Sequence, residues 1–386
     1  MIKKRAGLLA FMLIGLLLFT AGCTPKPAEQ AASDVIRIGV FEPMTGDSAA
    51  GGQMTWEGIE LAKELHGEVL GKEVELVLVD NKTDKNEAAN AAIRLIEKEK
   101  VVAIIGSYGS SLSMAAGPTV MEKKVPAVGC SPTNPLVTKD NPYYFRVCFI
   151  DPFQGSVMAQ YAYEDLGART AVIVRNVADA YSVGLNNFFK EAFIKLTGDD
   201  KAVLAELDYQ QGDQDFTAQL TSIKKENPDV IFAPGPYNDG ALMIIQARDL
   251  GITAPFLGGD TWEAPEFIQI GGQNVEGVAL STHYSIDAAP TEAAKEFVDA
   301  YKAKFNKDPN AFAALGYDAY MVILDAIERA NSYEPTAIRD ALAETAGFKG
   351  VTGTITLDDN GDATKSAVIL QVQDGAFKYL TTVEPN

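Results

Sequence analysis

Residues 101–128 read VVAIIGSYGSSLSMAAGPTVMEKKVPAV and contain the pattern of a strand, a helix and a second strand. Val101–Ile105 is an unbroken apolar run, which is typical of a strand that is buried on both faces. A helix is predicted over Ser110–Glu122, and Val125–Val128 has the composition of another short buried strand. This order indicates parallel strands joined by a helix, so the stretch predicts an α/β fold.

The same alternation extends over the rest of the chain and restarts after Asp151. Further strands are predicted at Val35–Phe41, Glu73–Val79, Thr170–Val174, Ala202–Leu207, Val230–Ala233 and Gly277–Leu280. Helices are predicted at Thr55–His66, Asn86–Lys100, Phe153–Leu166, Ser182–Leu196, Asp215–Glu226, Asp239–Leu250, Thr291–Phe305 and Phe312–Ala330. A body of about 350 residues is too long for one comfortable core, so two α/β units are expected.

A β-hairpin is predicted near the C-terminus. Thr352–Leu357 and Ala367–Val372 are alternating apolar runs on either side of the turn sequence Asp358-Asp359-Asn360-Gly361. Asn-Gly between two such runs favours a tight turn between antiparallel strands. These late segments must join one of the two α/β units.

The N-terminus has the features of a secretory signal. Basic residues 3–5 precede the apolar run 6–21, and Cys23 follows two small residues. Residues 1–22 are therefore predicted to be a signal peptide. The cysteine resembles that of the lipobox of bacterial lipoproteins, where the thiol is acylated, although Thr20 stands where leucine is usual.

Two alternatives to a lipid anchor on Cys23 are an ordinary signal peptide with a chance cysteine and a membrane-spanning anchor. The apolar run is about 16 residues long, shorter than the ~20 that a spanning helix needs. Residues 23–34 are polar and rich in proline and alanine, so they are predicted to form a flexible tether.

The chain is acidic, with 33 Lys and Arg against 52 Asp and Glu and a formal net charge of −19. Because nucleic-acid binding needs basic stripes, no nucleic-acid partner is expected. Cys130 and Cys148 either form a disulfide outside the cytoplasm or lie buried as small apolar side chains. His66 and His283 have no partner at ligand spacing and are expected to be structural or exposed, so neither a metal nor a cofactor is predicted.

Two loops that follow adjacent predicted strands are rich in hydroxyl groups. Gly106–Ser113 (GSYGSSLS) follows one strand and Gly129–Pro135 (GCSPTNP) follows the next. Ligands of open α/β sheets bind beyond the carboxyl ends of the strands, and a helix N-terminus favours an anion. A plain helix cap is the alternative for the first loop. Together the two loops favour a site for an anion the size of a carboxylate.

Two loops of the second unit occupy the matching places. Phe232–Asp239 (FAPGPYND) contains Tyr237, and Phe256–Trp262 (FLGGDTW) contains Asp260. They offer an aromatic ring and an acidic group. An acid that faces a hydroxyl-lined anion site suits a zwitterionic amino acid.

Several short motifs in these loops and strands occur in a characteristic order and spacing. They are Gly39-Val40, Met44-Thr45-Gly46, Asp80, Ile104 with Gly106, Ser110-Ser111, Ser131-Pro132-Thr133-Asn134-Pro135, Phe145-Arg146, Asp151, Gln154-Gly155, Tyr237 and Tyr317-Asp318-Ala319. With them the chain resembles the leucine/isoleucine/valine-binding proteins of ABC importers, from residue 36 to about residue 380. The resemblance implies the type I periplasmic-binding architecture, two doubly wound α/β domains joined by three hinge crossovers.

The resemblance also implies a role for individual residues of the loops. Ser110 and Thr133 match the family's carboxylate-binding hydroxyl residues, and Ser131 matches a backbone contact in the same loop. Asp260 matches the ammonium-binding acid, which is usually the longer glutamate in the branched-chain binders.

The aromatic residues of the family's cleft have partial counterparts here. Tyr181 and Tyr237 match residues that contact the ligand across the cleft. Gly51 stands where a familiar binder has an aromatic wall, and Gly109, preceded by Tyr108, stands where a bulkier residue is common. These differences predict a pocket larger than one shaped for valine, in which an aliphatic or an aromatic amino acid would fit.

The hinge crossovers implied by the resemblance lie near residues 147–151, 281–284 and 349–352. The N-terminal lobe would then consist of residues 35–148 and 284–349, and the C-terminal lobe of residues 151–281 and 352–380. In this division the two long late helices belong to the first lobe and the predicted hairpin belongs to the second. Closure about the crossovers would enclose a ligand.

The sequence shows neither the glycine fingerprint of a dinucleotide enzyme nor a nucleophile elbow, so an enzyme is not expected. We expect an extracytoplasmic, lipid-anchored solute-binding protein that captures a branched-chain or other hydrophobic amino acid and delivers it to an ABC permease. The alternatives are a ligand-binding module of a sensory receptor and a binder of small aromatic acids.

Overall fold

The computed structural model describes residues 35–288 and 291–385, so the predicted signal peptide, tether and Cys23 lie outside the described residues. The first sheet has six strands in the order β2-β3-β1-β4-β5-β6. All neighbouring strands in it are parallel except β2 and β3. The strands are β1 Val35–Glu42, β2 Glu68–Val69, β3 Lys72–Asp80, β4 Ala103–Gly106, β5 Ala127–Gly129 and β6 Tyr144–Arg146.

The second sheet has seven strands in the order β15-β14-β11-β10-β9-β7-β8. It is parallel from β11 to β8, and β14 and β15 extend it in antiparallel fashion. The strands are β7 Ala171–Asn176, β8 Val203–Tyr209, β9 Val230–Phe232, β10 Phe256–Gly258, β11 Ala279–Thr282, β14 Ala367–Gln373 and β15 Ala376–Val383. A separate ribbon pairs β12 Phe348–Gly350 with β13 Gly353–Ile355.

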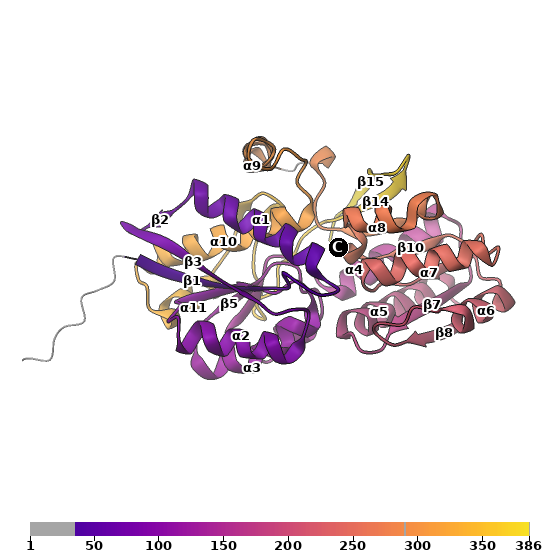
Figure 1. The fold of residues 1–386 in the computed structure, drawn as a ribbon, viewed down its shortest axis with the longest axis horizontal. Coiled ribbons are helices and arrows are strands. Elements are labelled where there is room, and N and C mark those ends of the chain that lie inside the picture. The colour runs from indigo at the N-terminus through magenta and orange to yellow at the C-terminus, as the bar shows by residue number, and fades with distance from the viewer. Residues whose placement is uncertain (1–34, 289–290, 386) are drawn as a thin grey trace, which may run out of the picture. The chain divides into compact units, whose positions relative to one another are not determined.

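Helices cover both faces of each sheet (Figure 1). On the first sheet, α1, α10 and α11 pack on one face and α2 and α3 on the other. On the second sheet, α4 and α5 pack on one face and α6, α7 and α8 on the other. The helices are α1 Ala49–Leu65, α2 Lys85–Glu97, α3 Ser110–Lys123, α4 Asp151–Gln160, α5 Ala180–Thr197, α6 Thr217–Glu226, α7 Tyr237–Asp249, α8 Pro265–Gly271, α9 Glu292–Phe305, α10 Ala311–Ala330 and α11 Pro335–Ala343.

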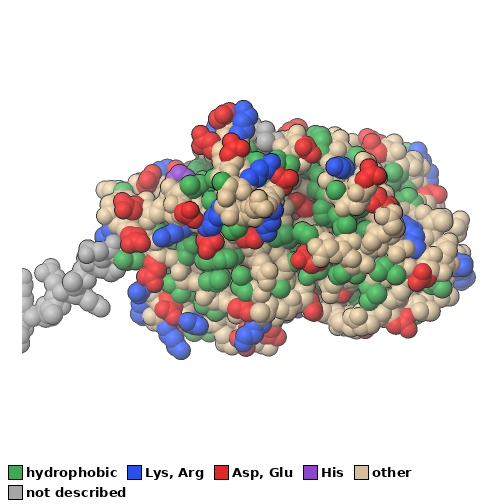
Figure 2. Space-filling view, turned by 45° about the horizontal axis from the view of Figure 1, so that its top comes forward, with side chains coloured by type: hydrophobic (Ala, Val, Ile, Leu, Met, Phe, Trp, Pro, Cys, Tyr) green, Lys and Arg blue, Asp and Glu red, His purple; other side chains and the backbone are tan. Residues whose placement is uncertain are grey.

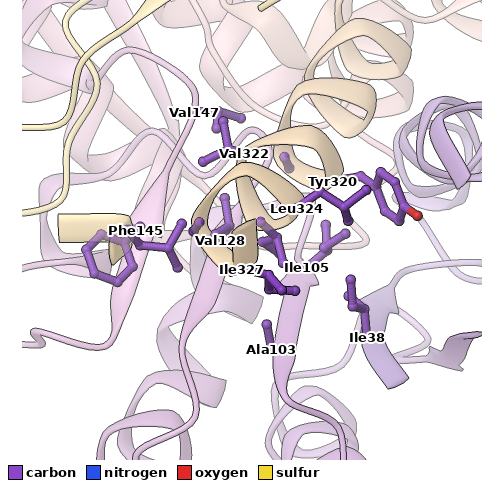
Figure 3. Close-up of a cluster of buried hydrophobic side chains, with 14 of the residues drawn as sticks. Ile38, Ala103, Ile105, Val128, Phe145, Val147, Tyr320, Val322, Leu324 and Ile327 are labelled. Carbon is purple, nitrogen blue, oxygen red and sulfur yellow. The ribbon is translucent and has the colours of Figure 1, made fainter. Parts of the chain in front are cut away.

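The sandwich of each sheet between helices follows from the apolar pattern of its strands. In β4, Ala103 and Ile105 point toward α10, whereas Ile104 points toward the opposite face, because successive side chains of a strand alternate. Figure 3 shows the hydrophobic core between the first sheet and α10, where Val322 and Ile327 of the helix lie over the strands. Burial on both faces explains why these strands are unbroken apolar runs. The predicted α/β fold class is confirmed.

The hairpin predicted around Asn360-Gly361 is wrong. β13 pairs with β12, and β14 pairs with β11 and β15. The turn at residues 358–361 does form, but it leads into an isolated bridge between Leu357 and Ala363 rather than into a ladder. Two hairpins form here, β12–β13 and β14–β15, and the second is closed by Asp374-Gly375 with φ values of 53° and 68°. Asp-Gly is itself a hairpin signal, so this turn was predictable from the sequence.

The chain passes between the two sheets at three places. The first passage lies between Arg146 at the end of β6 and Asp151 at the start of α4, and the second follows Thr282 at the end of β11. Ala363 still packs in the core of the first sheet, so the third passage follows this residue. It lies later in the chain than residues 349–352, the position that the family resemblance implied.

Charges of both signs are distributed over the face that Figure 2 shows, rather than gathered into a basic stripe. Within residues 35–288 and 291–385, no helix combines the length and the apolar character that crossing a membrane requires.

Candidate ligand-binding site

A cavity of about 70 Å³ lies between loops of the first sheet and loops of the second. The loops after β4, β5, β7, β9 and β10 contribute to it, so it lies at the carboxyl ends of parallel strands, where α/β folds bind ligands. The residues predicted from the sequence that line it are Tyr108, Ser110, Ser131, Tyr181, Tyr237 and Asp260.

The N-terminus of α3 forms one end of the cavity. The residue before the helix is Gly109, and no side chain caps the first turn. The Ser110 hydroxyl instead accepts a hydrogen bond from the backbone N–H of Asn134 at 3.1 Å. Because uncapped N–H groups carry a partial positive charge, this helix end favours an anion. The serines of this loop therefore do not cap the first turn of α3 with their side chains.

The loop after β5 adds hydroxyl groups to this end. Ser131 is buried, and its hydroxyl has no hydrogen-bond partner among the described residues. Thr133 is fully buried but is not among the lining residues. Its carbonyl accepts from the N–H of Asp151 at 2.9 Å. Burial raises the pKa of Asp151 to about 8 against the opposing effect of the Thr133 hydroxyl, so this carboxyl is largely protonated at neutral pH.

Asp260 forms the opposite, acidic end of the cavity. It follows β10 and is buried, and its Oδ1 accepts from the Tyr181 hydroxyl at 2.7 Å and from Nε2 of Gln154 at 2.9 Å. Nε2 of His283 lies 3.1 Å from Oδ2. Burial acts to raise the pKa of Asp260, but the hydrogen bond and the positive charge of His283, with the hydrogen bonds of Gln154 and Tyr181, together bring it below its ordinary value. The cavity therefore holds an ionised carboxylate.

Sequence reasoning missed three of the residues around Asp260. Gln154 stood out in the sequence only as part of a motif, and His283, which was expected to be structural or exposed, is buried rather than exposed. Its position directly after β11 was a usable signal, since this is a carboxyl end of the same sheet. Glu263 accepts a hydrogen bond from the Thr282 hydroxyl and another from the N–H of Ala311 at 3.1 Å.

The expectation that Gly51 leaves one wall of the pocket open is wrong. Gly51 lies in α1, and a Cβ placed on it would lie 2.2 Å from Cε2 of Tyr108. The Tyr108 ring therefore fills the space that the missing aromatic wall was expected to leave open. It packs edge-to-face on Phe312, with ring centroids 5.0 Å apart. The glycine at this position accordingly does not enlarge the pocket.

The cavity has two rims, one formed by loops of the first sheet and the other by loops of the second sheet, and hydrogen bonds join them. Nδ2 of Asn134 donates to the carbonyl of Ala180 at 2.8 Å, and Nζ of Lys85 donates to the carbonyl of Ala178 at 2.8 Å. An apolar cluster of Ala50, Met54, Tyr108, Ala264 and Phe312 also brings residues of the two sides together. The structure thus has the two rims in contact.

Cys130 and Cys148 are free and buried, as in the second alternative that the sequence left open. Burial raises the pKa of the Cys148 thiol to about 12. Among residues 35–288 and 291–385, no group of His, Cys, Asp and Glu side chains is arranged to hold a metal ion.

Comparison with known proteins identifies the class. The family model described as periplasmic binding protein matches residues 35–376, and the chain belongs to this family. Periplasmic binding proteins of ABC importers act outside the cytoplasm and bind small ligands. The match confirms the resemblance seen in the sequence.

Several individual relatives are binding proteins for leucine, isoleucine or valine by name. The chain is 30% identical to Leu/Ile/Val-binding protein homolog 3 of Brucella melitensis over 354 residues, 89% of this chain and 93% of that protein. The crystal structure of the leucine-binding protein LivK of Thermotoga maritima is 49% identical, with a TM-score of 0.88 over 91% of this chain and 99% of LivK. LivJ of Streptococcus pneumoniae in complex with isoleucine is 32% identical, with a TM-score of 0.85 over 91% of this chain and 100% of LivJ.

Proposed function

We propose that this chain is a receptor that binds a branched-chain or other hydrophobic α-amino acid and delivers it to the permease of an ABC importer. The observation that carries the proposal is the pairing of opposite charges in one cavity. Ionised Asp260 lines it, and so do the uncapped N-terminus of α3 and the buried Ser131 hydroxyl. These groups complement the ammonium and the carboxylate of a zwitterion. The names of the relatives LivK and LivJ support the same ligand class.

Each predicted site residue has a place in this proposal. The ligand carboxylate would accept hydrogen bonds from Ser110, Ser131 and the first N–H groups of α3, and Thr133 would support this loop. The ammonium would donate to Asp260. The rings of Tyr108, Tyr181 and Tyr237 would enclose the side chain of the ligand, with the Tyr181 hydroxyl held on Asp260.

We further propose that two lobes close on the ligand. The first would contain residues 35–148 and 284–349, and the second would contain residues 151–281 and 352–380. The packing of Ala363 on the first sheet supports moving the last boundary toward residue 364. The hydrogen bonds between the two rims support closure as the state in which a ligand is held.

The leader sequence supports the remaining part of the proposal. After removal of residues 1–22, a lipid on Cys23 would hold the receptor at the membrane, and residues 24–34 would serve as its tether. This arrangement would keep the receptor near the permease, outside the cytoplasm.

A thermal-shift screen of the twenty amino acids and of small aromatic acids tests the ligand class. A ligand that binds only the folded protein raises the melting temperature in proportion to the logarithm of its concentration over Kd. Leucine, isoleucine or valine should give the largest shift. A shift produced only by aromatic acids without an amine, or by no hydrophobic amino acid, would contradict the proposal.

A further inference from the structure

His283 lies directly against the carboxylate that we assign to the ligand ammonium. Its ring is buried, Nε2 is 3.1 Å from Oδ2 of Asp260, and the ring stacks on Phe149 with centroids 3.9 Å apart. The other oxygen, Oδ1, accepts from Tyr181 and Gln154. Donors on both oxygens therefore fix the orientation of Asp260.

The second ring nitrogen of His283 indicates which charge state the packing accommodates. Nδ1 is buried and has no hydrogen-bond partner among the described residues. In the neutral ring with its proton on Nε2, this atom is an acceptor, whereas in the imidazolium it carries a proton that needs an acceptor of its own. A buried N–H without an acceptor bears its full desolvation cost, so the packing favours the neutral ring.

The charged groups around the pair determine its net charge. Burial lowers the pKa of His283, Asp260 opposes this effect, and Lys365 adds to it. Glu263 and Asp151 lie in the field of Asp260, and burial raises their pKa values to about 7 and about 8. With a neutral imidazole, Asp260 loses the attraction of a positive ring but keeps the hydrogen bonds from Nε2–H of His283, Tyr181 and Gln154, which stabilise its ionised form, and its charge is then available to a cation.

We propose that His283 is a positioning residue of the ammonium site, which holds Asp260 in place through Nε2–H and leaves its negative charge for the ligand. The inference rests on the proposed function. Protonation of His283 would neutralise the pair, so a ligand ammonium would no longer meet a net negative charge. The affinity for an amino acid should therefore fall as the pH falls and His283 takes up a proton.

Because the chain contains only two histidines, variants of each can separate the effect of His283 on ligand binding from that of His66. Leucine binding is measured by isothermal titration calorimetry from about pH 5 to about pH 8, where histidine titrates. The variants are His283→Gln, which retains a neutral donor, and His283→Phe, which removes it. His66→Gln is the matched control, since His66 is exposed and contacts the Tyr317 hydroxyl at 3.0 Å.

The wild type and His66→Gln should lose leucine affinity toward about pH 5, at the lower end of the range in which histidine titrates, because burial lowers the pKa of His283. His283→Gln should bind within about threefold of the wild type at pH 7 and should lose the decline toward about pH 5, because a neutral amide donor does not titrate. Any pH dependence that comes from Glu263 and Asp151, whose pKa values are about 7 and about 8, should remain in both proteins. His283→Phe should bind about ten- to a hundredfold more weakly at pH 7, since Asp260 loses a donor to a charged group.

Two outcomes would overturn the inference: a pH dependence of His283→Gln as steep as that of the wild type, or wild-type affinity of His283→Phe at pH 7. An Asp260→Asn arm separates these failures from that of the proposed function. If Asp260→Asn binds leucine as the wild type does, both fail. If it binds weakly while both His283 variants behave as the wild type, only the role of His283 fails.

Discussion

The hydroxyl of Ser111 donates to Oδ1 of Asp179 at 2.8 Å and accepts from the N–H of Ala180 at 2.9 Å. Ser111 lies in the first turn of α3, which packs on the first sheet, and Asp179 is the N-cap of α5, which packs on the second. A single hydroxyl thus joins the starts of two helices from opposite sides of the cavity. Burial raises the pKa of Asp179, and the Ser111 hydroxyl opposes this effect.

Ser111→Ala should therefore weaken ligand binding by making the closed state less stable. The substitution removes both hydrogen bonds of the hydroxyl, each of which contributes about 1 kcal/mol. We expect the dissociation rate of leucine to rise roughly five- to thirtyfold while the association rate changes little. Stopped-flow measurement of dissociation tests this. Ser222→Ala on α6, where the hydroxyl bonds to the Ala218 carbonyl within the helix, is the control. A dissociation rate that is the same in Ser111→Ala and the wild type would refute the role.

Gly51→Ala tests the contact between α1 and Tyr108. Helix propensity alone predicts a stabilisation of roughly 0.5–1 kcal/mol for this change. The new Cβ would, however, lie 2.2 Å from the Tyr108 ring, and overpacking of this kind costs about 1–3 kcal/mol. We therefore expect a net decrease in the free energy of urea unfolding. The double variant Gly51→Ala/Tyr108→Leu should recover it, and a single variant more stable than the wild type would contradict the packing.

Asp80 should contribute stability that depends on pH. Its carboxylate accepts from the N–H groups of Met44, Thr45 and Lys82 and from the Thr45 hydroxyl. Burial acts to raise the pKa of Asp80, but these hydrogen bonds lower it below its ordinary value. The folded state thus binds this proton less tightly than the unfolded state, so the contribution is present above the unfolded pKa and is lost as the pH falls through the folded one.

Asp80→Asn should accordingly lower the free energy of unfolding by about 1 kcal/mol at pH 7, a figure that allows for solvent screening. The difference from the wild type should shrink as the pH falls below about 4, the pKa of an unfolded aspartate, and through the lower pKa that Asp80 has in the folded protein. Urea unfolding of both proteins at pH 7 and at a pH below about 4 tests this. Asp359→Asn in an exposed turn is the control. A difference of equal size at both pH values would show that the carboxylate charge is not involved.

Cys23→Ser tests the anchor, which lies outside the described residues. If Cys23 carries a lipid, the variant should move from the membrane fraction to the soluble fraction, since the acyl chains supply the membrane affinity. Fractionation followed by immunoblotting measures this. Retention of the variant on the membrane would indicate an uncleaved anchor instead.

The architecture was predictable because its main signal is local. Strands such as β4 are buried on both faces and therefore appear as apolar runs, and the helices between them have a clear period. The rule that ligands bind at the carboxyl ends of strands predicted that the loops containing Ser110, Ser131 and Asp260 meet, and these three residues line one cavity.

The remaining features depend on contacts that sequence patterns do not encode. Whether β13 pairs with β12 or with β14 is settled by tertiary packing rather than by the Asn-Gly turn. Gly51 suggested an open wall because the ring that fills it comes from Tyr108, far along the chain. The contact of His283 with Asp260 likewise joins residues after two different strands.

The most direct test of the account is the leucine affinity of Asp260→Asn, measured by isothermal titration calorimetry beside the wild type. Asparagine keeps the shape of the side chain but removes the charge that a ligand ammonium would need. We expect a loss of more than about tenfold in Kd, roughly 1.4 kcal/mol or more, and no loss for Asp249→Asn at the exposed end of α7. The wild type should also bind leucine far more tightly than 4-methylpentanoate, which lacks the amine. Equal leucine affinity of Asp260→Asn and the wild type would contradict the central claim that Asp260 binds the ammonium of an amino acid.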